Sequence, residues 1–225
     1  MPVVRTKNAR TIAVVGGTGA EGSGLALRWA ACGHRVIIGS RDAARARAAA
    51  QDLCALLDEG GIEGAASLDA ASEASVVVLA VPYAAQMHTA RSLKPALEGK
   101  VLIDVTVPLV PPKVGTVQLP PGGSSVVLVQ KELGEGVKVA SAFQNVSAHK
   151  LKKLDHPIAC DVLVCADAKE VRHLVIGLAG DAGLRGIDAG PLANSAAAEA
   201  LTSVLIWINR TYKVPDAGIA ITGIP

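Results

Sequence analysis

Apolar runs of strand length alternate along the chain with alanine-rich stretches of helical length. Four runs are continuous and largely β-branched, as expected of strands buried on both faces of a parallel sheet. They lie at 11–15, 35–38, 76–81 and 101–105. Helices are predicted at 25–32, 42–57 and 84–97. This β–α–β succession predicts an α/β fold with a doubly wound, mostly parallel sheet and right-handed crossovers.

The second half of the chain continues the alternation less regularly. Strands are predicted at 137–140, 158–165 and 183–187, and helices at 169–182 and 193–211. The last helix is apolar on most sides, so we expect it to be buried against its own domain or against a second subunit. A stretch rich in proline and glycine, 107–123, precedes these elements and is expected to be an irregular, mobile loop.

A glycine-rich loop directly follows the first predicted strand. Gly17, Gly19 and Gly22 match the pattern G-x-G-x-x-G between a buried strand and a helix, the context in which this pattern binds dinucleotides. In that role the first glycine allows a tight turn, the second lets the backbone approach a pyrophosphate, and the third lets helix and strand pack closely. The helix that follows offers free N–H groups and a positive dipole end to the anion. The sequence therefore predicts a Rossmann-type dinucleotide site rather than a merely structural turn.

The end of the second predicted strand indicates which dinucleotide binds. NAD sites generally carry an acidic residue there, about 20 residues past the glycines, which accepts from the ribose 2′-hydroxyl. This chain has Ser40 and Arg41 instead, followed by Arg45. A guanidinium can form a forked pair with phosphate oxygens, and the Ser40 or Thr18 hydroxyl can add a hydrogen bond. Asp42 is expected to cap the next helix, and the alternative for Arg45 is a solvated position on that helix. We therefore predict NADP over NAD.

Composition and charge exclude several classes of function. The 225 residues include 22 basic and 20 acidic ones, mixed along the chain, which is not the footprint of a nucleic-acid or anionic-membrane binder. Aromatic residues make up only 2%, which argues against stacking platforms. No apolar run reaches the roughly 20 residues of a membrane helix, and no signal-peptide pattern opens the chain. Four cysteines without metal-ligand spacing predict buried thiols, so we expect a soluble, cytoplasmic protein.

The other strand ends carry small, apolar or amide-bearing residues. Pro82 follows one predicted strand, and Gln144 and Asn145 follow another within the stretch 141–148. These segments lack the buried acid–base pair that proton chemistry requires, whereas hydride transfer needs mainly a dry slot for two flat rings. Gln144 and Asn145 are either satisfied turn amides or donors to a heterocycle carbonyl. Among the scattered histidines, His149 is placed best for a general acid, because it follows the amides.

Several segments together resemble the NADPH:coenzyme F-420 oxidoreductases. They are 16–28 (GGTGAEGSGLALR), 33–34 (GH), 39–41 (GSR), 80–83 (AVPY), 188–195 (DAGPLANS) and 199–202 (EALT). The similarity runs in order through nearly the whole chain, and DAGPLANS is more specific than the glycine loop. It implies hydride transfer between NADP(H) and F-420, an 8-hydroxy-5-deazaflavin. It also implies an NADP-binding Rossmann domain at 1–150 and a smaller C-terminal part at 151–225 that completes the deazaflavin cleft.

The same resemblance implies individual contacts, with no catalytic side chain and no metal ligands among them. NADP is expected to contact the glycine loop, the end of the second strand and apolar positions toward the nicotinamide: Thr18, Gly19, Ala20, Glu21, Ser40, Arg41, Arg45, Val81, Ala85, Val107 and Ala148. The deazaflavin is expected between the turn 142–148, the loop at Pro82 and the element 192–195. Its expected contacts are Pro82, Gln144, Asn145, Val146, Asn194 and Ser195.

Other functions remain open beside this one. The protein could use NADPH to reduce FMN, FAD, a quinone or a ferric complex, which tests with each acceptor distinguish. An imine or carbonyl reductase would need a proton donor, typically a lysine, and the strand ends offer none; the run Lys150, Lys152 and Lys153 is interpreted as a solvated face. A non-catalytic NADP(H)-sensing protein is the third class. The apolar last helix and the tail 217–225 predict a homodimer.

Overall fold

The computed structural model describes residues 6–58 and 61–224 of the chain. Residues 1–5, 59–60 and 225 lie outside the described residues. Residues 1–5 belong to the segment in which no signal-peptide pattern was found, and Pro225 ends the apolar tail. Within the described ranges, no helix is long and apolar enough to cross a membrane.

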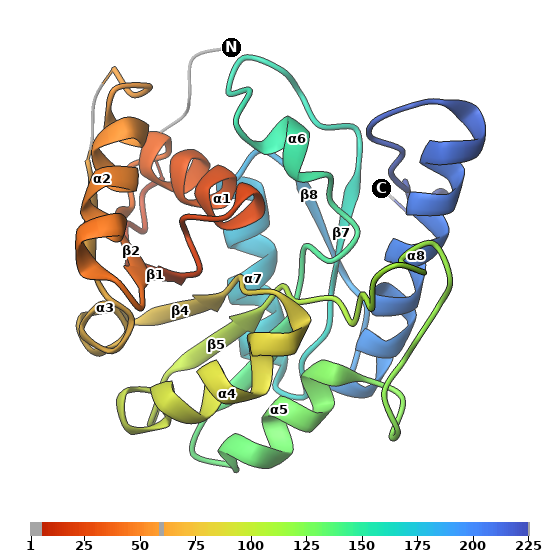
Figure 1. The fold of residues 1–225 in the computed structure, drawn as a ribbon, viewed down its shortest axis with the longest axis horizontal. Helices are drawn as coiled ribbons and strands as arrows, with labels where there is room; N and C mark the ends of the chain where they lie inside the picture. Colours follow the sequence, from red (N-terminus) through yellow and green to blue (C-terminus); the bar gives the residue numbers. More distant parts are fainter. Residues whose placement is uncertain (1–5, 59–60, 225) are drawn as a thin grey trace.

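A six-stranded sheet forms the centre of the molecule, in the order β3-β2-β1-β4-β5-β6 (Figure 1). Its strands are β1 (Thr11–Val15), β2 (Arg35–Ser40), β3 (Ile62–Ala66), β4 (Val76–Leu79), β5 (Val101–Asp104) and β6 (Lys138–Ser141). All five pairings are parallel, which confirms the predicted doubly wound sheet. The strand order reverses between β1 and β4, and in open α/β sheets ligands bind beyond the carboxyl ends of the strands at that point.

Helices cover both faces of this sheet (Figure 1). They are α1 (Ala20–Ala31), α2 (Ala43–Cys54), α3 (Ser67–Glu73), α4 (Tyr83–Leu93), α5 (Ser125–Leu133), α6 (Ala148–Leu151), α7 (Lys169–Asp181) and α8 (Ser195–Tyr212), with 3-10 turns η1 (Lys94–Ala96) and η2 (Leu192–Asn194). Alternate residues of each strand enter different cores. In β1, Ile12 and Val14 join the core of α1, α2 and α7, whereas Ala13 and Val15 join that of α3, α4 and α5. The apolar runs are continuous because both faces are buried.

A second, two-stranded parallel sheet lies next to β6. It consists of β7 (Asp161–Val164) and β8 (Arg185–Asp188), and an antiparallel bridge between Ser141 and Cys165 joins it to the large sheet. Val162 of β7 belongs to the same core cluster as β1 and α1, so both sheets share one hydrophobic core. The C-terminal tail runs beside β7, where the backbone N–H of Asp161 donates to the carbonyl of Ile219 at 2.8 Å.

The structure contains β3, α3 and α5, which the sequence pattern did not predict. In β3 the residues Glu63 and Gly64 interrupt any apolar run, and a side chain at position 64 would collide with the backbone of α2. Helix α5 follows the proline-rich loop directly, and its N-cap, Ser124, accepts from the N–H of Val127 at 3.1 Å. Helix α1 begins at Ala20 rather than at residue 25, because its N-cap is within the glycine loop.

The guanidinium of Arg28 joins α1 to the segment that follows β6. It is buried, which lowers its pKa. It donates at 2.7–3.4 Å to the carbonyl oxygens of Lys150, Leu151, Lys153, His156 and Ala182. Several of these carbonyls lie at the C-terminal ends of α6 and α7, where carbonyls lack helical partners and the helix dipole is negative. The cation therefore caps two helices that a different part of the chain supplies.

Two further contacts fix the same segment on α1. The rings of Trp29 and Phe143 pack edge to face, with centroids 5.8 Å apart and an interplanar angle of 82°. Phe143 has a positive φ of 72°, which is unfavourable for a non-glycine residue, and the buried ring contact compensates for it. Gly24 lies directly against Leu151, where a Cβ would collide with that side chain. Helix α1 thus carries the turn after β6 as well as the glycine loop.

Replacing Arg28 with alanine should destabilise the protein by about 2–4 kcal/mol, because buried carbonyls lose a charged donor. Equilibrium urea unfolding measures the change. Arg47→Ala, on the exposed side of α2, is the control and should change the free energy of unfolding by less than about 0.5 kcal/mol. Equal unfolding midpoints for the two variants would contradict the role assigned to Arg28.

Candidate functional site

The glycine loop lies at the carboxyl ends of β1 and β4. Gly16 has a φ of +86°, and a Cβ there would collide with the carbonyl of Ala80, so Gly16 rather than Gly17 makes the turn that only glycine allows. A Cβ on Gly22 would come within 2.8 Å of the Gly16 carbonyl oxygen, so this glycine lets α1 pack closely on the loop. Gly19 is exposed and its backbone is accessible. The loop therefore has the geometry that a pyrophosphate-binding turn requires.

Helix α1 begins at this loop without a side-chain cap, because its N-cap is Gly19. Glu21 lies in the first turn, and its Oε1 is buried with no hydrogen-bond partner among the residues that the structure describes. Burial raises the pKa of Glu21 to about 8. At neutral pH the side chain is therefore mostly uncharged, and the helix N-terminus keeps its positive character toward an anion.

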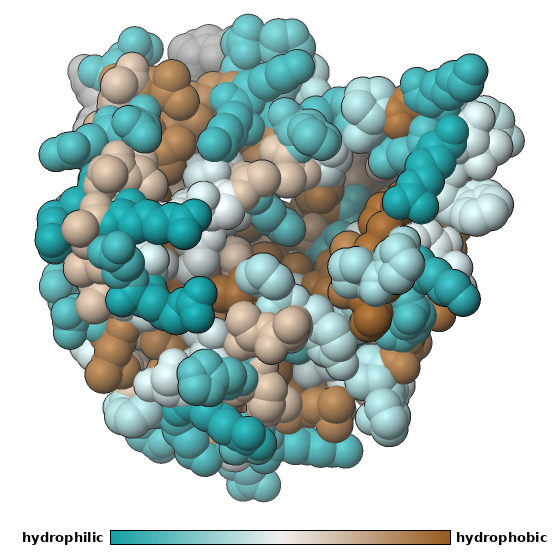
Figure 2. Space-filling view, viewed as in Figure 1, coloured by the Kyte–Doolittle hydropathy of each residue, from teal (hydrophilic) through white to brown (hydrophobic). Residues whose placement is uncertain are grey.

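A pocket of about 290 Å³ opens beside the glycine loop. It brings together eight of the predicted contacts: Thr18, Gly19, Ser40, Arg41, Arg45, Val81, Pro82 and Ala85. These residues come from the loop, the end of β2, the start of α2 and the segment after β4. The same view as Figure 1, drawn as spheres, shows a hollow between the sheet and α8 whose floor carries hydrophobic residues (Figure 2).

The end of β2 supplies the charged part of this pocket. Asp42 caps α2 as predicted, because its carboxylate accepts from the N–H groups of Ala44 at 2.8 Å and Arg45 at 3.2 Å. This carboxylate is thereby engaged with the backbone of the helix, while the Arg41 and Arg45 side chains are exposed at the pocket. Two guanidinium groups and the Ser40 hydroxyl form a surface suited to a phosphate monoester.

Six further residues line the pocket. Val15, Gly16 and Ala80 belong to the predicted first strand, the glycine loop and the predicted strand 76–81, whereas Ser67, His88 and Thr89 were not indicated by the sequence. Ser67 begins α3 directly after β3, so it was missed together with that strand. His88 and Thr89 lie three and four residues after Ala85 on α4, which places them on the same helix face. The helical spacing from Ala85 was the signal that could have found them.

Four predicted NADP contacts lie outside the lining of this pocket. Ala20 and Glu21 are in the first turn of α1, Val107 is half-buried in the loop after β5, and Ala148 begins α6. His149, next to Ala148, is exposed.

The turn after β6 presents two amide oxygens rather than two amide donors. The Nε2 of Gln144 donates to the carbonyl of Asp104 at 2.7 Å, and the Nδ2 of Asn145 donates to the carbonyl of Asp161 at 2.7 Å. Both donors are thus satisfied, the first of the two alternatives given by the sequence. The Oε1 of Gln144 and the Oδ1 of Asn145 are buried without a partner among the described residues. Buried acceptors are usually hydrogen-bonded, so these two oxygens require a donor from outside the described protein groups, either a water molecule or a ligand with N–H or O–H groups.

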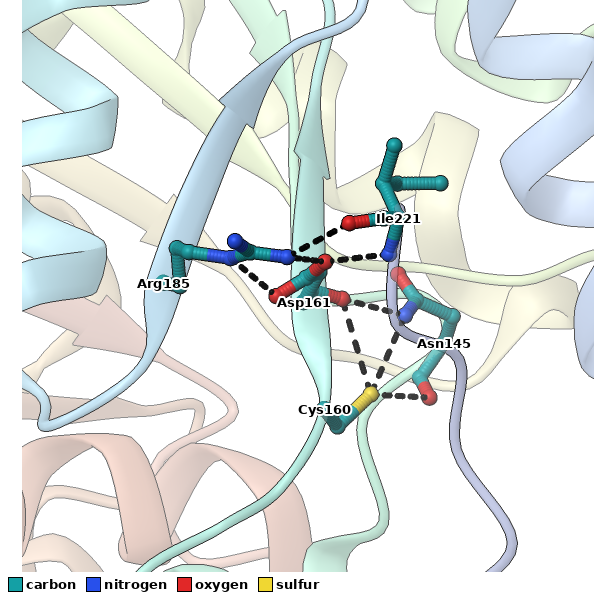
Figure 3. A network of polar contacts seen from close by, with 5 residues as sticks. All are labelled: Asn145, Cys160, Asp161, Arg185 and Ile221. Carbon is teal, nitrogen blue, oxygen red and sulfur yellow. Dashed lines mark hydrogen bonds and ion pairs between the residues drawn. The ribbon is translucent and has the colours of Figure 1, made fainter. Parts of the chain in front are cut away.

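A network of polar contacts fixes the position of Asn145 (Figure 3). The Asp161 carboxylate accepts from the Arg185 guanidinium at 2.6 and 2.8 Å and from the N–H of Ile221 at 2.6 Å. These contacts hold the pKa of Asp161 below its usual range. The Sγ of Cys160 adds a contact of 3.3 Å with Asn145. One residue of β7 therefore links β8, the C-terminal tail and the turn.

The other predicted deazaflavin contacts occupy different environments. Val146 is buried and belongs to the main core cluster. Ser195 is fully buried, with its hydroxyl 2.7 Å from the Ser124 hydroxyl and 2.6 Å from the Leu192 carbonyl oxygen, so its hydrogen bonds lie within the protein. Asn194 is exposed, and its Nδ2 donates to the carbonyl of Ala189.

Comparison with known proteins identifies the family. Residues 11–108 match the family model described as NADP oxidoreductase, coenzyme F420-dependent. The F420-dependent NADP reductase of Methanocaldococcus jannaschii is 42% identical over 221 residues, which cover 95% of this chain and 98% of the relative. The chain belongs to the F420-dependent NADP reductase family. A solved structure of a proposed F420-dependent NADP reductase from Arthrobacter sp. FB24 superimposes with a TM-score of 0.77 at 25% identity, covering 95% of this chain and 100% of that one.

Members of other protein classes share part of this architecture. The metalloreductase STEAP3 of Rattus norvegicus is 27% identical over 209 residues, which cover 93% of this chain but 39% of STEAP3. The F420-dependent NADP reductase relative, by contrast, matches over almost its whole length. No group of three or more potential metal ligands is found in residues 6–58 and 61–224 of this family member.

Proposed function

We propose that the protein transfers a hydride directly between NADP(H) and coenzyme F-420. One observation carries this proposal: the pocket beside the open glycine loop contains Ser40, Arg41 and Arg45. It lies in a chain that matches an F420-dependent NADP reductase over 95% of its length. The two bound coenzymes supply the redox chemistry, and the protein contributes binding, orientation and exclusion of water.

The NADP side is assigned to the first part of the chain. The backbone at Gly19 and the uncapped start of α1 bind the pyrophosphate. The phosphate on the ribose is bound by Ser40, Arg41 and Arg45. Toward the nicotinamide, the proposed contacts are the apolar residues Val81, Ala85, Val107 and Ala148.

The acceptor side is assigned to the turn after β6 and to residues 151–225. We propose that these C-terminal residues complete the cleft for the electron acceptor. The free amide oxygens of Gln144 and Asn145 accept from N–H groups, which the pyrimidine edge of a deazaflavin provides. A quinone presents carbonyl acceptors instead and leaves these oxygens unsatisfied. A flavin shares the pyrimidine edge with the deazaflavin, so FMN is the comparison that the test must include.

An absorbance assay tests the proposed reaction. With NADPH and oxidised F-420, the purified protein should bleach the deazaflavin rapidly. The reaction should be slower when NADH replaces NADPH, and also when FMN replaces F-420. The reason is that the pocket carries guanidinium groups for a 2′-phosphate, which NADH lacks. Binding of NADPH without any bleaching of F-420 would refute F-420 as the acceptor. Faster reaction with FMN would transfer the proposal to a flavin reductase.

The double variant Ser40→Asp/Arg41→Ala tests the 2′-phosphate site. NADPH affinity should fall roughly tenfold to a hundredfold, corresponding to about 1.5–3 kcal/mol for a lost charge-assisted contact, and the preference over NADH should narrow. Titration of nucleotide binding by calorimetry measures both affinities. The control is Arg47→Ala, which keeps all pocket residues. Unchanged NADPH affinity in the double variant would show that the 2′-phosphate binds elsewhere.

We also propose that the protein is a homodimer that acts in the cytoplasm. Val204 and Trp207 of α8 are 44% and 61% exposed, and Val117 of the loop before α5 is 43% exposed. The loop lies against α8, since a Cβ on Gly115 would be 3.6 Å from the Trp207 ring. This surface is apolar enough to bind a second copy. The cysteines are thiols, which persist in a reducing compartment.

Sedimentation velocity tests the dimer. The wild-type protein should sediment as a dimer and Trp207→Glu as a monomer, because a charge at the centre of an apolar interface is left without a partner. Leu56→Glu is the matched control: Leu56 is also exposed, at 57%, but it lies away from α8 and should leave the dimer intact. A wild-type protein that sediments as a monomer would refute the proposal.

A further inference from the structure

Asp104 is a fully buried carboxyl group at the carboxyl end of β5. Its hydrogen-bond partners among the described residues are neutral donors: its Oδ1 accepts from the N–H of Thr106 at 2.9 Å, and its Oδ2 accepts from the Nε2 of Gln86 at 2.7 Å. A carboxyl group that is buried without a cationic partner is uncommon, because desolvation disfavours its charge. Its position in the fold therefore calls for an explanation.

The same residue holds the turn that carries the free amide oxygens. The backbone carbonyl of Asp104 accepts from the Nε2 of Gln144, and this bond determines that the Oε1 of Gln144 is the atom left without a partner. The carbonyl of Gln144 in turn accepts from the Thr202 hydroxyl of α8 at 2.7 Å. Asp104 thus orients the acceptor-side amide through its backbone.

The side chain of Asp104 connects this point to the NADP pocket. Gln86 belongs to α4, directly after the pocket residue Ala85, and Thr106 directly precedes Val107. The Nε2 of Gln86 also lies 3.4 Å from the hydroxyl of Ser125. Asp104 and Gln86 do not line the pocket, so an effect on ligands must pass through their neighbours.

Helix α8 closes a ring of contacts around this group. The Glu199 carboxylate accepts from the N–H of Ser125 at 2.8 Å and from the Ser124 hydroxyl at 2.6 Å. The ring runs from Asp104 through Gln86, Ser125 and Glu199 to α8, and returns through Thr202 and Gln144. Four helical or turn segments around the end of β5 are therefore held in one arrangement.

We propose that the side chain of Asp104, acting through Gln86, Thr106 and the ring of contacts that returns to Gln144 by way of α8, is a positioning residue for the electron acceptor and loosens the acceptor side when it gains a proton. The inference rests on the proposed function. The charged form accepts from two donors at once. A proton on either oxygen places a donor against the N–H of Thr106 or the amide of Gln86, and one of these hydrogen bonds is lost.

The pH range follows from the surroundings of the group. The pKa of Asp104 is raised to about 6, chiefly because the group is buried. The hydrogen bonds from Thr106 and Gln86 lower this pKa, and the negative charge of Glu199 on α8 raises it. The facing groups on α4, on α5 and in the turn after β6 are the uncharged Gln86, Ser125 and Gln144. At pH 7 the carboxylate is therefore charged, and the acceptor KM should rise as the pH falls through about 6.

The contribution of Asp104 to the stability of the fold should change with pH in the opposite direction to its effect on acceptor binding. The folded-state pKa of Asp104 lies above that of an unfolded aspartate, so between these two values the folded state binds more protons. The contribution of this group to stability is fully present below the unfolded pKa and is lost as the pH rises through about 6. The titration of Asp104 therefore does not itself destabilise the fold at low pH, and the melting temperature measured at each pH separates a weaker acceptor site from unfolding.

Steady-state kinetics with NADPH and oxidised F-420 between pH 5 and pH 8 test the proposal in three variants. Asp104→Ala should raise the KM for F-420 about tenfold at pH 7.5, with a smaller difference from the wild type below pH 6. The KM for NADPH should stay within about twofold, because the proposed phosphate contacts are unchanged. Asp104→Asn imitates the uncharged form, with one acceptor for Thr106 and a donor against Gln86, so its KM for F-420 should be raised at pH 7.5 and show no further rise through pH 6. Titration of F-420 itself cancels in the ratio of variant to wild type.

Gln130→Ala is the control for a structural effect. The Gln130 side chain on α5 makes three hydrogen bonds away from the pocket beside the glycine loop: two with the carbonyls of Gly134 and Val137, between α5 and β6, and one with the N–H of Val139 in β6. It should lower the melting temperature and leave both KM values unchanged. An Asp104→Asn profile that follows the wild type through pH 6, or equal effects of Asp104→Ala and Gln130→Ala on KM, would overturn the proposal. A wild-type protein that does not reduce F-420 would instead refute the proposed function.

Discussion

The contact between Arg28 and the carbonyl ends of α6 and α7 determines how the two halves of the site meet. The glycine loop and the turn after β6 are more than a hundred residues apart in sequence, as the hydrogen bond from Arg28 to the Leu151 carbonyl shows with its separation of 123 residues. Both are attached to α1, one at its N-terminus and the other through Arg28, Trp29 and Gly24. Any tilt of this helix would move the dinucleotide loop and the acceptor turn together.

Two kinds of polar arrangement surround the site, and they differ in solvent exposure. The proposed phosphate-binding side has exposed guanidinium groups, whose charge water can screen when no ligand is present. The acceptor side uses buried amides, hydroxyls and two buried carboxyl groups, Asp104 and Glu199. Buried polar groups act only at fixed distances, so this side needs the closed ring of contacts that α8 completes. The difference explains why the proposed acceptor side includes the last helix of the chain.

Much of the fold and of the pocket beside the glycine loop could be predicted, because their signals are local. The strands β1, β2, β4 and β5 are continuous apolar runs, and the glycine loop and Ser40-Arg41 are short motifs next to them. The roles of Asp104, Gln86 and Glu199 could not be predicted, because each is a single polar residue in an otherwise apolar or amphipathic stretch and they meet only in space. Arg28 posed the same difficulty, since a basic residue in a helix ordinarily faces water. The orientation of the Gln144 amide required the position of the Asp104 carbonyl.

The outer edge of β6 has a consequence for self-association through strands. β6 is the last strand of the large sheet, and such an edge normally offers unpaired N–H and carbonyl groups to any other extended chain. Here the Gln130 side chain accepts from the N–H of Val139, and the backbone of Cys165 pairs with both polar groups of Ser141. In a chain that is half hydrophobic, these contacts occupy the N–H of Val139 and both polar groups of Ser141, and so reduce the template that this strand offers for amyloid-like growth.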